Sequence, residues 1–80
     1  MEINILAFGI AKDIFGGPLS TLHIERDPSV GTLKLLLEAR YPRLKRLSSY
    51  MVAINNEYAF DGLVIGELDE VAIIPPVSGG

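Results

Sequence analysis

The segment from residue 33 to residue 41 is the best helix candidate in this chain, and its shortness constrains the fold. A helix of this length is marginal in water by itself, so it must be stabilised by packing against a sheet. We expect Thr32 to cap its start and Pro42 to end it, because the residue before a proline is disfavoured in helical geometry. Apolar side chains share one face of this helix: Val30, Leu33, Leu36 and Leu37, with Leu35 and Ala39 widening the stripe.

Segments with strand character lie on both sides of this helix. They are residues 3–10, 19–25, 50–54, 58–60 and 71–74. The first is apolar on both alternating faces apart from Asn4, which predicts a strand inside a sheet. The second should bury Leu22 and Ile24 and pair with the first as a hairpin, because residues 16–18 are a Gly-Gly-Pro turn signal. Residues 55–56, Asn-Asn, predict another tight turn. Two strand pairs around one helix predict an α+β domain with the helix on one face of the sheet.

The last predicted strand is followed by Pro75-Pro76-Val77-Ser78-Gly79-Gly80. The two prolines fix φ and favour a stiff, extended exit from the sheet. Six extended residues reach roughly 20 Å, and the two glycines let the end of the chain enter a slot too narrow for a Cβ atom. We therefore divide the chain into a folded domain, residues 1–74, and an extended tail, residues 75–80. A frayed end without a chemical role is the alternative.

Composition excludes several classes of function. The chain contains no cysteine, which excludes disulfides, thiol nucleophiles and cysteine metal ligands. The net charge of -3 argues against nucleic-acid binding. No apolar run approaches the roughly 20 residues needed to span a bilayer, and the N-terminus has no signal-peptide pattern, so we expect a cytoplasmic protein.

The charged and glycine residues suggest no stand-alone active site. His23 is the only histidine, so no metal site is expected. The cations Arg40, Arg43, Lys45 and Arg46 are interpreted as a solvated helix end or a docking patch. Glu67, Asp69 and Glu70 are interpreted as a solvated acidic turn that docks a partner, in preference to an acid-base pair or a cation site. No Gly-Lys-Ser/Thr sequence follows the glycines, so ATP must be bound by another protein.

The remaining chemical group is the carboxylate of Gly80. A free carboxylate is a poor acylating agent, but adenylation by ATP would make it a mixed anhydride that sulfur can attack. The resulting thiocarboxylate is an activated nucleophile that could transfer sulfur to an electrophilic carbon. The chain would then supply a co-substrate and not be an enzyme on its own.

The residues also carry a family resemblance. Residues 69–80, Asp-Glu-Val-Ala-Ile-Ile-Pro-Pro-Val-Ser-Gly-Gly, resemble the C-terminal signature of the small, sulfur-carrier subunit of molybdopterin synthase. Phe8-Gly9 with Lys12-Asp13, Thr32-Leu33 and Val52-Ala53-Ile54-Asn55 resemble further family segments, in matching order. The resemblance implies a ubiquitin-like β-grasp fold, with a mixed four- to five-stranded sheet and one main helix. Leu68 departs from the pattern, because the family usually has glycine there, so the turn into the last strand is expected to be rebuilt.

The resemblance further implies the partners and the site. An E1-like adenylyltransferase would activate Gly80 with ATP, and a sulfurtransferase donor would supply the sulfur for a covalent thiocarboxylate; no cofactor is expected to be bound. The tail, Pro75, Pro76, Val77, Ser78 and Gly79, would insert into the large catalytic subunit of a heterotetramer. There, sulfur would be delivered to cyclic pyranopterin monophosphate in molybdenum cofactor biosynthesis.

Apolar residues near the strand ends could belong to the core or to a partner surface: Phe8, Phe60, Leu63 and Ile74. We prefer Phe8 and Ile74 as interface residues, with Lys12, because the positions that they resemble flank the tail in this family. Three alternatives stay open. They are a thiamine-type sulfur carrier, a ubiquitin-like modifier conjugated to lysines through Gly80, and a passive ubiquitin-like binding module.

Overall fold

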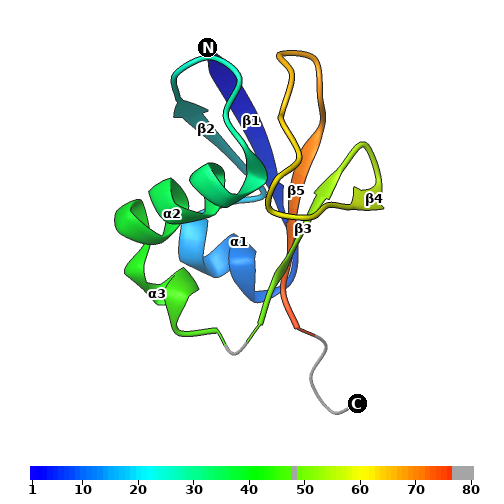
Figure 1. Cartoon of the computed structure of the whole chain (residues 1–80). Helices are drawn as coiled ribbons and strands as arrows, with labels where there is room; N and C mark the ends of the chain where they lie inside the picture. Colours follow the sequence, from blue (N-terminus) through cyan, green and yellow to red (C-terminus); the bar gives the residue numbers. More distant parts are fainter. Residues whose placement is uncertain (48, 77–80) are drawn as a thin grey trace.

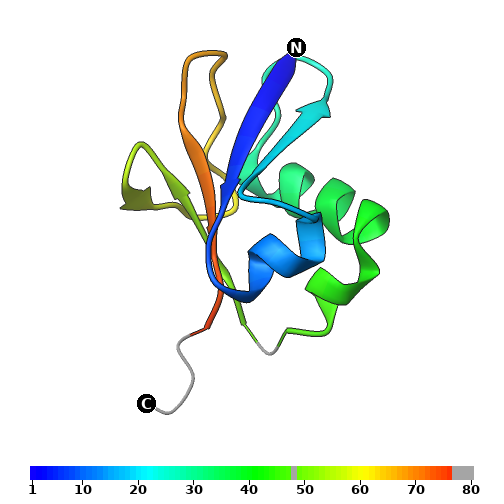
Figure 2. The same ribbon diagram turned by 180° about the vertical axis from the view of Figure 1, so that it is seen from behind.

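The structure, a computed structural model, describes residues 1–47 and 49–76. These residues form five strands and three helices, arranged as a sheet with the helices on one face (Figures 1 and 2). The strands are β1 (Glu2–Ala7), β2 (Leu19–His23), β3 (Met51–Ile54), β4 (Glu57–Tyr58) and β5 (Val71–Ile74). The helices are α1 (Ile10–Phe15), α2 (Val30–Arg40) and α3 (Pro42–Lys45).

The sheet is mixed, with the strand order β2-β1-β5-β3-β4. Strand β1 pairs antiparallel with β2 and parallel with β5, while β3 pairs antiparallel with both β5 and β4. The first and last strands of the chain are therefore neighbours at the centre of the sheet. The predicted α+β class, the inner position of the first strand and the two strand pairs are confirmed.

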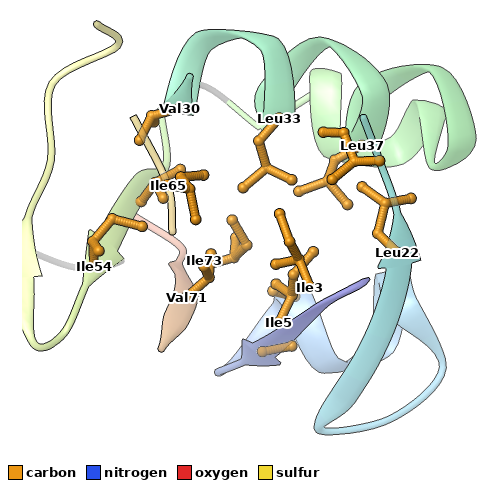
Figure 3. Packing of buried hydrophobic residues seen from close by; sticks show 14 of the residues in the cluster. Ile3, Ile5, Leu22, Val30, Leu33, Leu37, Ile54, Ile65, Val71 and Ile73 are labelled. Carbon is orange, nitrogen blue, oxygen red and sulfur yellow. The ribbon is translucent and has the colours of Figure 1, made fainter. Parts of the chain in front are cut away.

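The core lies between α2 and the inner face of the sheet (Figure 3). Leu33 and Leu37 of α2 are fully buried, and Ile5 and Ile73 face them from the two central strands. Full burial of each such side chain contributes about 1.5–3 kcal/mol relative to leaving it in water. The prediction that Leu22 and Ile24 are buried is confirmed. This packing supplies the stability that α2 lacks by itself.

The predicted first strand, residues 3–10, is too long. It ends at Ala7, and the following residues form helix α1, which the sequence pattern did not predict. Gly9 turns the chain with φ 55° and ψ -133°, and Gly16 ends the helix in the left-handed conformation at φ 82°. Both values favour glycine because it has no Cβ. A short apolar run fits a strand or a buried helix equally well, which explains the error.

The main helix also differs from its prediction. It begins at Val30, and its cap is Ser29, not Thr32: the Ser29 Oγ accepts a hydrogen bond of 3.1 Å from the Thr32 N–H. Its apolar stripe is narrower than expected, because Leu35 and Leu36 are 70% and 40% exposed. Ala39 is exposed as well.

The predicted end of the main helix is confirmed, because α2 stops at Arg40. Tyr41 then has non-helical angles, with φ -126° and ψ 82°. Pro42 opens the short helix α3, where the missing N–H of a first-turn proline costs nothing.

The predicted Asn-Asn turn is confirmed. Asn55 and Asn56 both have positive φ, 53° and 69°, and they connect β3 to β4. Asparagine tolerates this conformation better than other residues with a side chain. The returning strand, expected at residues 58–60, is Glu57–Tyr58. Among residues 1–47 and 49–76, no helix combines the length and the apolar character that crossing a membrane requires.

Replacing the cap residue tests the boundary of α2. We expect Ser29→Ala to lower the free energy of unfolding by about 1 kcal/mol, because the Thr32 N–H loses its acceptor. Urea denaturation followed by circular dichroism measures the change. Thr32→Ala is the matched control, and it should cost less than half as much. A larger loss for Thr32→Ala would restore Thr32 as the cap.

Candidate functional site

The tail leaves the domain from the centre of the sheet. It follows β5, which lies between β1 and β3, and its first residue, Pro75, is half-buried whereas Pro76 is exposed. Residues 77–80, which include the predicted sulfur site Gly80 and the tail residues Val77, Ser78 and Gly79, lie outside the described residues. The site can therefore be described only up to its base.

The base of the tail packs against the turn that connects β1 to α1. A Cβ atom added to Gly9 would lie 3.0 Å from Cγ of Pro75, which is closer than ordinary van der Waals contact. Positive φ and this close approach both favour glycine at position 9. The first residue of the tail is thus held by the domain, at the end of a central strand.

An apolar surface surrounds this base on the outer face of the sheet, opposite the helices. Cross-strand partners share one face of a sheet, and the register pairs Met51 with Ile74 and Ala53 with both Ala72 and Tyr58. Phe8, which directly follows β1, lines the same hollow of about 320 Å³ as Ala72 and Ile74. We define the outer patch as Phe8, Met51, Ala53, Tyr58, Ala72 and Ile74.

The outer patch has a floor of small residues and a rim of large ones. Ala53 and Ala72 are almost fully covered, although they do not belong to the core on the other side of the sheet. Around them, Phe8 is 50% exposed, Met51 45% and Tyr58 68%. Such a concave apolar surface is typical of protein–protein interaction sites.

The structure brings Phe8 and Ile74, the two preferred interface residues, into one surface beside Pro75. Lys12 is exposed on α1, where its N–H donates to the Gly9 carbonyl at 3.1 Å, and it does not line the hollow. Phe60 is exposed and Leu63 is half-buried, and neither lines the hollow. The interface role of these residues stays a prediction.

Sequence reasoning missed four members of the outer patch: Met51, Ala53, Tyr58 and Ala72. A signal for three of them was present, because alternate residues of β3 and β5 lie on the face away from the helix. The last strand reads as a continuous apolar run, which hid the fact that it serves two different surfaces.

The acidic turn at residues 66–70 is built around Asp69. Its Oδ2 accepts a hydrogen bond from the Gly66 N–H at 2.7 Å, and its Oδ1 accepts one from Nδ2 of Asn55 at 3.0 Å. These bonds, that from Gly66 above all, hold the pKa of the Asp69 carboxyl below its usual range. Asp69 therefore closes the turn, which leaves Glu67 and Glu70 as the exposed carboxylates of the expected docking turn.

Leu68 fits this turn because its side chain points into solvent and is 98% exposed. It is not among the residues with positive φ, so the backbone at this position does not require glycine. The expected rebuilding of the loop is confirmed: the Asp69 N–H donates to the Gly66 carbonyl at 3.2 Å and closes a tight turn.

A second polar cluster fastens the strands to α2. The Tyr50 hydroxyl donates a hydrogen bond to the Glu38 carboxylate, and Lys34 forms an ion pair of 2.8 Å with Asp61. Burial raises the pKa of the Tyr50 hydroxyl above its usual range, and the neighbouring Glu38 charge raises it further. These groups have partners, and they explain the position of α2 without any catalytic role.

The single histidine is exposed on β2, with its Nε2 3.7 Å from a carboxylate oxygen of Glu2. Across the part of the chain that the structure describes, no group of three or more potential ligands could hold a metal ion.

The Asp69 turn predicts a specific pH dependence. The folded-state pKa is depressed, so the stabilisation is complete above the unfolded value of about 3.9 and is lost as the pH falls through the folded value. We expect Asp69→Asn to be less stable than the natural protein at pH 7, with the difference shrinking below pH ~4. Urea midpoints at several pH values measure it. A difference independent of pH would contradict this role.

Comparison with known proteins identifies the family. The ThiS family model matches residues 5–80. The chain is 38% identical over 84 residues to the molybdopterin synthase sulfur carrier subunit of Arabidopsis thaliana, which covers all of this chain and 84% of the relative.

Solved structures share the fold over the full length. The crystal structure of SAMP1, the small archaeal modifier protein 1 of Haloferax volcanii, superposes with a TM-score of 0.83 at 26% identity, covering 100% of both chains. A chain from the complex of subunits 1 and 2 of the molybdopterin-converting factor of Helicobacter pylori matches with a TM-score of 0.68 at 17% identity, again over 100% of both chains, which shows the fold alone. The expected ubiquitin-like β-grasp fold is thus confirmed. The chain belongs to the ThiS family, and it is a homologue of the sulfur carrier subunits of molybdopterin synthase.

Proposed function

We propose that this chain is the sulfur carrier of a molybdopterin synthase and that the carboxyl group of Gly80 carries the sulfur. The observation that carries the proposal is the outer patch at the base of the tail. A partner that covers this surface receives the tail at the same time, because Pro75 leaves the domain between β1 and β3. The rigid base then sets where the end of the chain can reach.

The proposed chemistry needs no side chain of this protein. A carboxylate oxygen of Gly80 attacks the α-phosphorus of ATP in an E1-like adenylyltransferase, and pyrophosphate leaves. A sulfide equivalent from a sulfurtransferase donor then attacks the acyl carbon and expels AMP, which leaves a thiocarboxylate. In the large subunit, this sulfur attacks an electrophilic carbon of cyclic pyranopterin monophosphate, and hydrolysis of the acyl–sulfur bond restores the carboxylate.

The absence of a β-carbon at Gly80 suits both steps. Attack on an acyl carbon requires an unobstructed approach, and glycine presents only hydrogen atoms beside the reacting group. The domain contributes position: it presents the outer patch as a docking surface and holds Pro75 beside it. The complex of subunits 1 and 2 from Helicobacter pylori supports a heteromeric arrangement for this chain too.

The tail alone offers too little surface for a stable complex. A standard interface buries about 800 Å² on each partner, with a central cluster of apolar or aromatic residues that provides most of the affinity. The outer patch meets this requirement with Phe8, Met51 and Tyr58 around the alanine floor. Phe8 and Ile74 therefore keep their assignment as partner-contacting residues within the proposal.

One observation favours a second candidate function, that of a protein modifier. The structure of SAMP1, named as a modifier, matches the whole chain at 26% identity. The same adenylated Gly80 would then be attacked by a lysine amine instead of sulfide, which gives an isopeptide bond. The two functions share activation, and they differ in the atom that attacks the acyl carbon.

Intact mass spectrometry separates these functions. After incubation with the adenylyltransferase, ATP and a sulfur donor, we expect the mass to rise by the difference between a sulfur and an oxygen atom. Deleting Gly80 should abolish this gain while leaving the thermal unfolding transition in place, because the tail lies beyond the last strand. Covalent adducts to other proteins without the sulfur gain would instead support the modifier.

Truncating a rim residue tests the docking surface. We expect Phe8→Ala to weaken binding of the large subunit at least ten-fold, equivalent to about 1.4 kcal/mol, since an aromatic side chain at an interface centre is a common hot spot. The control is Leu36→Ala, which removes a side chain of comparable exposure, 40% against 50%, from the helix on the other face. Calorimetric titration measures both. Equal losses for the two variants would remove the outer patch from the proposal.

A further inference from the structure

We infer that the exposed cations of α3 form a docking surface for a carboxylate-rich protein surface around the slot that accepts the tail. The inference rests on the proposed function, because it adds the charge of the partner to the site described above. The residues are Arg43, Lys45 and Arg46, which we name the basic corner. They are exposed, and they lie within four residues of the chain.

Packing forces these side chains outward. Leu44 is fully buried in the core, and this single contact sets the rotation of α3. Its neighbours Arg43 and Lys45 point to either side of it, away from the sheet, and Arg46 follows at the C-terminal end of the helix. The cations are therefore presented to solvent as a group by a buried anchor.

No described carboxylate neutralises the basic corner. The ion pairs within residues 1–47 and 49–76 are Glu2–His23 and Lys34–Asp61, and neither involves α3. The neighbouring Arg40 lies with its guanidinium 5.7 Å from the centre of the Tyr41 ring, so it already has a local contact. Cations near a helix C-terminus gain a modest stabilisation from the helix dipole, but like charges held this closely also repel one another. Folding alone does not account for three.

Charge is segregated along the molecule. The end that carries the N-terminus, residues 24–29 and the acidic turn is opposite the end that carries α3 and the base of the tail (Figure 1). The first end holds six carboxylates and one cation: Glu2, Glu25, Asp27, Glu67, Asp69, Glu70 and Arg26. A protein with a net charge of -3 thus presents a positive surface where the tail leaves.

The basic corner lies within the range of an interface centred on the outer patch. Arg46 precedes Met51 by five residues, a span of at most about 18 Å, and Met51 pairs with Ile74 next to the tail. An interface of about 800 Å² per partner extends roughly 16 Å from its centre. A partner that covers the outer patch therefore meets the cations at the rim of the contact, where charge chiefly affects the association rate.

The chemistry of the surface favours a protein over a nucleic acid. Single-stranded nucleic acids need aromatic rings on which bases stack. The aromatic residue nearest in sequence, Tyr41, is half-buried and packs on Phe15 with 4.7 Å between ring centres. Carboxylates of a protein rim require only exposed cations, which the basic corner supplies.

Association kinetics test the inference. The triple variant Arg43→Glu/Lys45→Glu/Arg46→Glu and its neutral counterpart with glutamine are mixed in stopped flow with the adenylyltransferase and with the large subunit of the same organism. With at least one partner, we expect the association rate in low salt to fall stepwise, reaching about ten-fold or more for the triple glutamate variant. The dissociation rate should change little, and the difference should vanish near 1 M salt, where charges are screened within about 3 Å.

A matched pair of single variants controls for net charge. Arg46→Glu and Arg26→Glu change the charge equally, but Arg26 lies at the acidic end, so only Arg46→Glu should slow association. Equal rates for this pair, or a triple variant that is as fast as the natural protein with both partners, would overturn the inference. Tighter binding of a poly-uridine RNA than of either protein, in the same buffer, would do so as well. Failure of the natural chain to gain sulfur in mass spectrometry would instead refute the proposed function, independently of these rates.

Discussion

The parallel pairing of β1 with β5 is the constraint on which the rest of this structure depends. It joins the first and last strands of the chain at the centre of the sheet, with Ile5 opposite Val71 in the register. Both side chains are fully buried, so the pair cannot shift by one residue without exposing its apolar side chains. The tail consequently begins at a rigid position in the middle of the domain, and not at a loose edge.

The sheet separates stability from recognition by its two faces. Alternate residues of β5, Val71 and Ile73, pack under α2, while Ala72 and Ile74 face the other way beside the base of the tail. All helices cover the inner face (Figure 2), which leaves the outer face available to a partner. A small domain can in this way bury a complete core and still present an apolar docking surface. Charge adds a third element, because the cations of α3 are displayed by the burial of Leu44.

Much of this architecture could be predicted from local patterns. The last strand was placed at its observed bounds because Pro75-Pro76 cannot continue a ladder, and the Asn55-Asn56 turn followed from residues that tolerate positive φ. Helix α1 was missed because a six-residue apolar segment fits either a strand or a helix. The cap of α2 was misplaced by three residues, since both Ser29 and Thr32 carry the required hydroxyl.

The sequence by itself determined the chemistry of the tail: Gly79-Gly80 behind two prolines, with no cysteine anywhere, leaves the terminal carboxyl as the reactive group. It also determined the class of fold, because one short helix between strand pairs has few ways to bury its apolar face. Only the tertiary structure decided which apolar residues form the core and which form the outer patch. Met51 and Ile74 resemble core residues in composition, and they become a surface because the register places them on the face that no helix covers. Burial is a property of the assembled sheet, and local sequence does not contain it.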